Sequence, residues 1–201
     1  MKTKILAAGC LHSDITQIRR LAQLAEDENV DFVVLAGDLT HGEHSIEGIL
    51  GPFIKKNKKV FLVPGNHESV ATADFLAQAY GAVNLHSYAS KLQNIGLFGC
   101  SAANIGPHAI SEQEIWYLLK KGFTYIQNSD KKIMVTHVHP ARLKTSDLTF
   151  LPGSISVTKA LGELRPDLLV CAHMHEAEGI EERVGNTRVI HVGKKGTIVE
   201  F

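Results

Sequence analysis

The sequence contains few cysteines, few aromatic residues and no excess of either charge. Its three cysteines are odd in number and lie far apart, which excludes the disulfide framework of a small secreted domain. Lysine plus arginine (21) equals aspartate plus glutamate (21), so no basic surplus favours nucleic acid as a partner. No apolar run approaches the ~18 residues that a transmembrane helix needs. His12 and Asp14 follow the short N-terminal apolar stretch, which argues against a signal peptide. We therefore expect a cytoplasmic protein without a membrane partner.

Hydrophobic residues make up 44% of the 201 residues, which is enough for one domain spanning residues 1–201. Short apolar runs alternate with segments of helical periodicity. Strands are expected at 5–8, 32–35, 60–63, 133–135 and 168–170, with weaker ones in 85–98 and two in the tail after 187. Helices are expected at 15–29, 46–54, 71–80, after Ser111, and at 157–164. Continuous apolar strands between helices indicate sheets that are covered on both faces, which is an α/β fold.

Five of these strands are followed directly by histidine, aspartate or asparagine. The residues concerned are His12 and Asp14, Asp38, Asn66 and His67, His137 and His139, and His173 and His175. In open α/β sheets, ligands bind beyond the carboxyl ends of the strands. Residues two apart in an extended segment point the same way, which pairs Cys10 with His12. Imidazole, carboxylate and amide oxygen together can hold two divalent or trivalent metal ions, and Asp38 is the carboxylate best placed to bridge them.

These residues also carry a family resemblance. The set Gly37-Asp38, Gly65-Asn66-His67-Glu68, His137 and His173-Met174-His175 resembles the signature of the calcineurin-like metallophosphoesterases, in the same order and over residues 5 to about 193. The resemblance implies a four-layer double β-sandwich flanked by helices, with a two-metal site at the strand ends. It assigns His12, Asp38 and His175 to one ion, and Asp38, Asn66, His137 and His173 to the other. It places His67 beside the phosphate and the leaving group, so that His67 and Asp38 are the expected catalytic residues.

Two positions depart from the signature. Cys10 stands where the family has aspartate, and Ala172 replaces the glycine before the last histidine pair. Cys10 as a thiolate would ligate the first ion and shift its preference towards zinc or iron. Cys10 as a neutral thiol would leave that ion to water or to Asp14. Both alternatives remain open, and Mn, Fe, Zn or Ni are the ions that we expect.

The expected function is a metal-dependent phosphoesterase. It would hydrolyse a small phosphomonoester or phosphodiester by attack of a metal-bridging hydroxide. The alternative is a catalytically weak metal-binding scaffold or sensor of the same fold, motivated by the lost aspartate. A nuclease is disfavoured because the sequence has no basic or aromatic stripe. A homo-oligomer stays open, and residues 99–113 are a candidate for the substrate entrance.

The remaining histidines divide by their position relative to these motifs. His41 follows the Gly37-Asp38 motif closely, which makes it a candidate for lining the site. His139 is expected to lie behind the ligands, because Pro140 bends the chain after it. We expect ordinary core or surface roles for His44, His86, His108 and His191.

Overall fold

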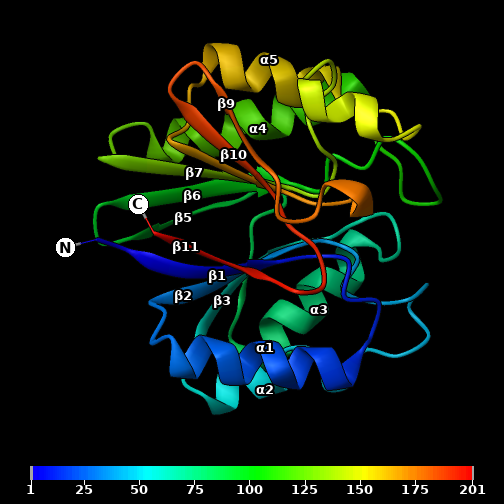
Figure 1. Ribbon diagram of the computed structural model, residues 1–201, viewed down its shortest axis with the longest axis vertical. Helices are drawn as coiled ribbons and strands as arrows, with labels where there is room; N and C mark the ends of the chain where they lie inside the picture. Colours follow the sequence, from blue (N-terminus) through cyan, green and yellow to red (C-terminus); the bar gives the residue numbers. More distant parts are fainter. Residues whose placement is uncertain (1, 201) are drawn as a thin grey trace.

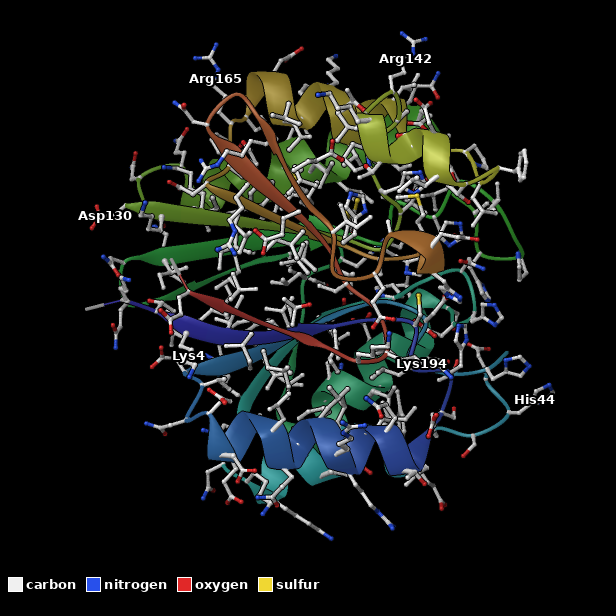
Figure 2. All side chains as sticks on the ribbon, in the orientation of Figure 1. Lys4, His44, Asp130, Arg142, Arg165 and Lys194 are labelled. Carbon is white, nitrogen blue, oxygen red and sulfur yellow. The ribbon has the colours of Figure 1, made fainter. Side chains whose placement is uncertain are left out.

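A computed structural model describes residues 2–200 of the chain. Two β-sheets pack face to face, and helices cover the outer face of each sheet (Figure 1). The resulting order of layers is helices, sheet, sheet, helices, which confirms the predicted α/β double sandwich. Charged side chains such as those of Arg142 and Arg165 project away from these layers into solvent (Figure 2).

The first sheet has the strand order β11-β1-β2-β3-β4. Its strands are β1 (Lys4–Ala8), β2 (Phe32–Ala36), β3 (Lys59–Val63), β4 (Val83–Asn84) and β11 (Thr197–Glu200). β1 to β4 are parallel, and β11 joins β1 antiparallel. All five residues of β2 are buried, because a helix layer covers one face of this strand and the second sheet covers the other.

The second sheet has the strand order β5-β6-β7-β8-β10-β9. Its strands are β5 (Ala89–Leu92), β6 (Ile95–Cys100), β7 (Lys131–Thr136), β8 (Leu168–Cys171), β9 (Glu181–Val184) and β10 (Thr187–His191). The four central strands are parallel, and β5 and β9 are antiparallel edges. β9 was not predicted from the sequence, because its charged residues at a half-exposed edge show no apolar run.

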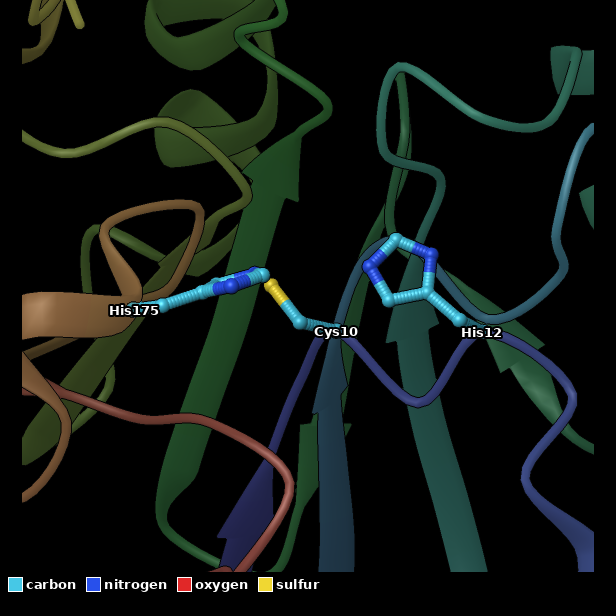
Figure 3. A group of neighbouring side chains, drawn as sticks. All are labelled: Cys10, His12 and His175. Atoms are coloured by element: carbon cyan, nitrogen blue, oxygen red, sulfur yellow. The ribbon is translucent and has the colours of Figure 1, made fainter.

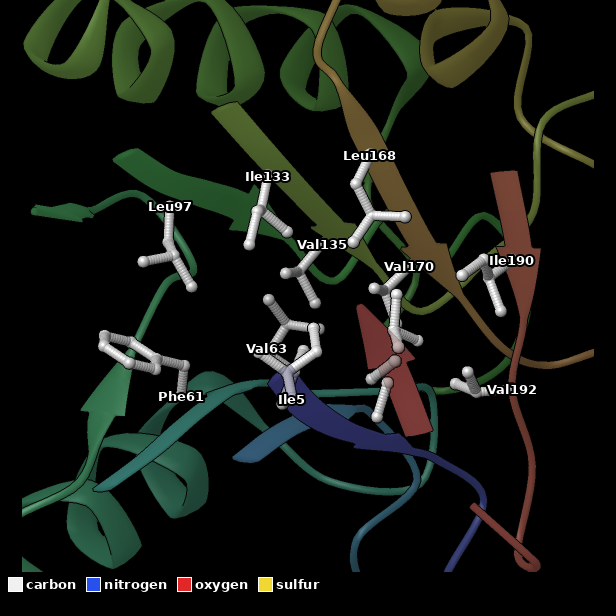
Figure 4. Close-up of a cluster of buried hydrophobic side chains, with 14 of the residues drawn as sticks. Ile5, Phe61, Val63, Leu97, Ile133, Val135, Leu168, Val170, Ile190 and Val192 are labelled. Atoms are coloured by element: carbon white, nitrogen blue, oxygen red, sulfur yellow. The ribbon is translucent and has the colours of Figure 1, made fainter. Parts of the chain in front are cut away.

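The core between the sheets is built from aliphatic side chains of both (Figure 4). Ile5 and Val63 of the first sheet lie in one buried cluster with Ile133 and Val170 of the second. Burying one such side chain contributes roughly 1.5–3 kcal/mol. Because this cluster links the sheets, it fixes the distance between the strand ends of the two sheets.

Five α-helices are described within residues 2–200. α1 (Ile15–Asp27), α2 (Gly51–Lys55) and α3 (Val70–Tyr80) pack on the first sheet, and α4 (Glu112–Ile126) and α5 (Ile155–Glu163) pack on the second. Short 3-10 helices lie at Lys144–Leu148 and His175–Ala177. Ser111 caps α4 by accepting a hydrogen bond from Glu114 N, in agreement with the helix expected after Ser111. α3 ends at Tyr80 as expected, and Gly81 caps it in the left-handed conformation.

The predicted helix over 46–54 is wrong in its extent. α2 covers only Gly51–Lys55, and the segment before it forms turns. Gly48 has φ +73°, which interrupts a helix, and Pro52 suits a helix start because its missing N–H needs no partner there. In the part of the chain from residue 2 to residue 200, no helix is long and apolar enough to span a bilayer.

Candidate metal centre

The predicted site residues lie in the loops that follow β1, β2, β3, β7 and β8. Backbone hydrogen bonds tie these loops to one another. Cys10 N donates to Gly37 O at 2.9 Å, and Ala172 N donates to His137 O at 2.8 Å. The first bond joins two loops of the first sheet, and the other joins two loops of the second. The parallel strands of both sheets thus deliver their polar residues to one edge of the sandwich.

Several of these residues have left-handed backbone conformations. The φ angles are 51° at Cys10, 46° at His12, 50° at Asp38 and 68° at His173. Each such conformation costs a non-glycine residue roughly 1–2 kcal/mol. The surrounding hydrogen bonds stabilise it, and strain of this kind is concentrated at functional sites. The loops turn sharply here, and the turn directs the side chains across the strand ends.

Asp38 is held by the loop that follows β3. Its Oδ1 accepts hydrogen bonds from Asn66 N at 2.9 Å and from His67 N at 3.1 Å. A side chain at Gly65 would place its Cβ 2.1 Å from Asp38 Oδ1, so this close approach requires glycine. Asp38 Oδ2 is left to face His137 Nε2 at 3.3 Å and His12 Nε2 at 3.7 Å. One carboxylate oxygen is therefore fixed, and the other points into the site.

His137 has a defined tautomer when it is neutral. Its Nδ1 lies 2.9 Å from Ala36 O, and because a carbonyl only accepts, Nδ1 carries the hydrogen. The lone pair of Nε2 then faces three further atoms: Asn66 Oδ1 at 3.0 Å, His173 Nδ1 at 3.1 Å and Asp38 Oδ2 at 3.3 Å. Two of the three are oxygens with lone pairs. A group that satisfies all of these atoms together must be positive.

When no ion is bound, a proton on His137 Nε2 is one such positive group, and the pKa directions favour it. Burial raises the pKa of Asp38, but the hydrogen bond and charge of His137 outweigh burial and lower it below its usual value. Burial lowers the pKa of His137, but the hydrogen bond and charge of Asp38 outweigh it and raise the pKa. Burial and then the charge of His137 lower the pKa of His173 to about 3. A neutral His173 and an ionised Asp38 are the forms that ligate metals.

A second group of donors lies beside the first. One ligand atom each of Cys10, His12 and His175 lies within 4.8 Å of the others (Figure 3). The same holds for Cys10, Asp38 and His137, so the Cys10 thiol lies between the two groups. Within residues 2–200, the buried His12 Nδ1 and His173 Nε2 have no hydrogen-bond partner. The donor set, N, O and S together, suits transition-metal ions.

The Cys10 thiol is neutral in these surroundings. Burial, followed by the charge of Asp38, raises its pKa to about 12. Its side chain is 1% exposed. A cation beside the sulfur has the opposite effect on the pKa and stabilises the thiolate. Both alternatives from the sequence, thiolate ligand and neutral thiol, therefore depend on whether an ion lies next to Cys10.

The structure gives physical reasons for two other features of the motifs. A Cβ added to Gly9 would lie 2.7 Å from the Cβ of Ala172, so the Ala172 methyl occupies the space that Gly9 leaves. Glu68 is fully buried and accepts hydrogen bonds from Gly65 N at 2.6 Å and Thr40 N at 3.0 Å. Glu68 thus joins the loops after β2 and β3, a role that was not predicted from the sequence.

The structure brings all the predicted site residues to one place. A cavity of about 180 Å³ is lined by His12, Asp38, Asn66, His67, His173 and His175, together with Leu151 and Glu176. Cys10 and His137 lie below these residues and are buried. The loop expected at the entrance approaches the site at Gly106, where an added Cβ would lie 3.2 Å from the Asn66 Cβ. Leu151 and Glu176 at the mouth were not predicted, and no motif marks them.

The remaining histidines fall into those away from the site and those beside it. His86 and His191 are buried and hydrogen-bonded, and His44 is exposed. His139 is buried beside the His173 ring, with the ring centroids 6.4 Å apart. His41 lies at the mouth, next to His12 and His67.

Comparison with known proteins agrees with this geometry. A family model described as calcineurin-like phosphoesterase matches residues 3–177. TT1561 of Thermus thermophilus has a similar structure, with a TM-score of 0.81 and 16% identity over 100% of this chain and 99% of that one. A dimetal phosphatase from Danio rerio gives a TM-score of 0.66 and 14% identity over 96% of this chain and 88% of the other. GAP50, described as the anchor in the inner membrane complex of Plasmodium, gives a TM-score of 0.64 and 13% identity over 96% of this chain and 71% of the other. A comparison with curated proteins found no match.

The structural neighbours are only 13–16% identical in sequence to this chain, so they show a shared fold and not a shared activity. The family model, in contrast, matches most of the chain and includes every residue of the site described above. The order of the motifs, the double sandwich and the matched residues agree. The chain belongs to the calcineurin-like phosphoesterase family.

Proposed function

We propose that this protein is a metal-dependent hydrolase of small phosphate esters that works with two metal ions. The observation that carries the proposal is the convergence at His137 Nε2. Three donor atoms, from Asp38, Asn66 and His173, lie 3.0–3.3 Å from it. Lone pairs that face one another at these distances repel, unless a cation or a shared proton lies between them. A bound cation removes that repulsion.

The proposal includes two ligand sets, which the positions of these side chains support. We assign Asp38, Asn66, His137 and His173 to one ion, and Cys10, His12, Asp38 and His175 to the other. When bound, the ions supply a nucleophile by acidifying water and neutralise charge on the phosphoryl oxygens. Thiolate and imidazole at the second set favour zinc or iron over magnesium, with Mn and Ni as further candidates.

His67 has a different position from the proposed ligands. It is half-buried at the mouth, with its ring centroid 4.7 Å from that of His12. Its backbone N–H holds Asp38 Oδ1, which fixes where the side chain leaves the loop. From the mouth, a protonated His67 can donate to the oxygen of the departing alcohol. We therefore assign to His67 the protonation of the leaving group.

The substrate is a small ester, of either the mono- or the diester class. The cavity of about 180 Å³ is large enough for the phosphoryl group of a small ester. The even charge balance favours a small molecule over nucleic acid. We propose that the protein acts in the cytoplasm.

A catalytically weak metal-binding scaffold is the second candidate. The observation in its favour is Cys10, which stands where the family has aspartate. An ion at this position would have one carboxylate ligand fewer than in the family. The neighbour GAP50, described as an anchor, has the same fold.

One experiment separates the two candidates. The protein is freed of metal, reloaded with Mn, Fe, Ni or Zn, and assayed on a panel of phosphomonoesters and phosphodiesters beside the Asp38→Asn variant. We expect turnover of at least one ester class that Asp38→Asn loses. Two bound ions without turnover of any ester would reject the enzyme in favour of the scaffold.

A further inference from the structure

Three histidines form a separate group at the mouth of the cavity. One ring nitrogen each of His12, His41 and His67 lies within 4.8 Å of the others. The ring centroids are 4.7 Å apart for His12 and His67, 5.4 Å for His41 and His67, and 5.9 Å for His12 and His41. They come from the loops after β1, β2 and β3, so the sheet itself brings them together.

The proposed metal pair does not account for His41. The convergent donors around His137 and Cys10 do not include it. His41 is exposed, so core packing does not explain its position either. Its ring faces the one imidazole of the mouth to which we assign no metal, that of His67.

The chemistry of the three side chains defines the ligand. Three imidazoles select a borderline or soft cation such as Zn²⁺ over Mg²⁺ or Mn²⁺, which prefer oxygen. Three protein ligands with a fourth position left to water is a common zinc arrangement. Nitrogens bound tetrahedrally at about 2.0–2.1 Å from zinc lie about 3.3 Å apart. Small rotations of the half-buried His12 and His67 and the exposed His41 close the remaining gap.

We propose that His12, His41 and His67 form an additional zinc site that inhibits the enzyme. The inference rests on the proposed function. Zinc at the mouth takes the His12 imidazole away from the metal pair and occupies the His67 ring nitrogen that would otherwise carry the proton for the leaving group. The ion also lies across the cavity that admits the ester. The positive charge of the metal pair repels it, so it binds more weakly than the pair and acts at excess zinc.

Binding is tested first, by a readout that needs no activity. Histidine ring signals of the full chain are followed by nuclear magnetic resonance during addition of Zn²⁺ and, separately, Mg²⁺. The signal lost in His41→Ala identifies His41, and the signal lost in His44→Ala identifies the control. His44 is exposed on the same loop and points away from the site (Figure 2). We expect zinc to shift the His41 signal and leave His44 in place, whereas magnesium moves neither.

Inhibition is tested on the manganese-loaded enzyme with increasing zinc. We expect zinc to lower the turnover of the wild type and of His44→Ala alike. His41→Ala should need at least about 10-fold more zinc for the same inhibition, because loss of even a residue that only supports a metal ligand lowers metal affinity by that factor. His41→Cys restores a zinc ligand without an imidazole and should restore zinc sensitivity. Rescue by cysteine separates a metal ligand from a residue that merely orients His67.

Two results would overturn the inference. The first is a His41 signal that does not respond to zinc, which counts against the site even if the protein hydrolyses no ester. The second is a His41→Ala variant with reduced basal turnover and unchanged zinc sensitivity, which would make His41 a positioning residue. If His41 responds to zinc in the absence of any esterase activity, the zinc site stands and the proposed function alone fails.

Discussion

The two halves of the metal centre differ in how firmly the fold holds their side chains. Around His137, the donor atoms of Asp38, Asn66 and His173 lie 3.0–3.3 Å away, in a buried setting. Around Cys10, His12 is half-buried with its Nε2 3.7 Å from Asp38 Oδ2, and His175 is exposed. The first half is therefore more deeply buried and more closely spaced than the second. Under the proposed two-ion assignment, we therefore expect one ion to be a fixed part of the site and the other to be exchangeable.

The largest effect is expected from the residue that the two halves share. Asp38→Asn should abolish turnover, because an amide cannot balance the charge of two cations. The fold should survive, since the side-chain Oδ1 of the asparagine still accepts from Asn66 N and His67 N. Turnover and bound metal are measured on the purified variant, with a thermal melt as the fold control. Near wild-type turnover at full metal occupancy would contradict the bridging role.

The second largest effect is expected from His67, which belongs to neither half of the metal centre. His67→Ala should lower turnover by about 10²–10⁴-fold, the usual range for general acid catalysis, and leave the metal content unchanged. The loss should shrink for nitrophenyl esters, whose leaving group needs no proton. Rates on alkyl and nitrophenyl esters are compared, with metal analysis of both proteins. A missing ion in the variant would assign His67 to a ligand set instead.

Metal removal tests whether the two halves of the metal centre bind their ions with different affinity. During stepwise chelation, we expect one ion to leave at a concentration of chelator at least about 10-fold lower than the other, because the set with the exposed His175 is more accessible to solvent. His175→Ala should weaken only the ion that leaves first. Asn66→Ala should weaken the other. Loss of both ions in a single step would show that the two halves bind their ions with equal affinity.

A smaller effect is expected from Cys10. If its thiolate binds an ion, the sulfur should lie about 2.3 Å from zinc in a structure of the loaded protein. Cys10→Asp should then keep activity and shift the metal preference towards Mn, while Cys10→Ser weakens the exchangeable ion. Affinities for Zn and Mn are measured for all three proteins. Equal affinities throughout would make Cys10 a spectator and leave the ion to His12, Asp38, His175 and solvent.

Parts of the fold could be predicted because their signals are local. The strands expected at 32–35 and 60–63 show as apolar runs and lie within β2 and β3, and α3 ends at Tyr80 as expected. Other parts depend on context that a local pattern lacks. The edge strand Glu181–Val184 forms because β10 offers a partner, and α2 is shortened by Gly48 and Pro52 within an otherwise helical pattern.

For the site, the sequence alone determined the residue types and their order. Histidine, aspartate and asparagine come directly after the strands, and parallel strands deliver their trailing loops to one edge of the sheet. Only the tertiary structure decided the distances, because these depend on how the core between the sheets spaces the loops of β2 and β3 from those of β7 and β8. The burial of Cys10 between two donor groups, and the meeting of His41 with His12 and His67, arise from contacts between segments far apart in the chain. No local pattern encodes such contacts, since each depends on packing to which every strand contributes.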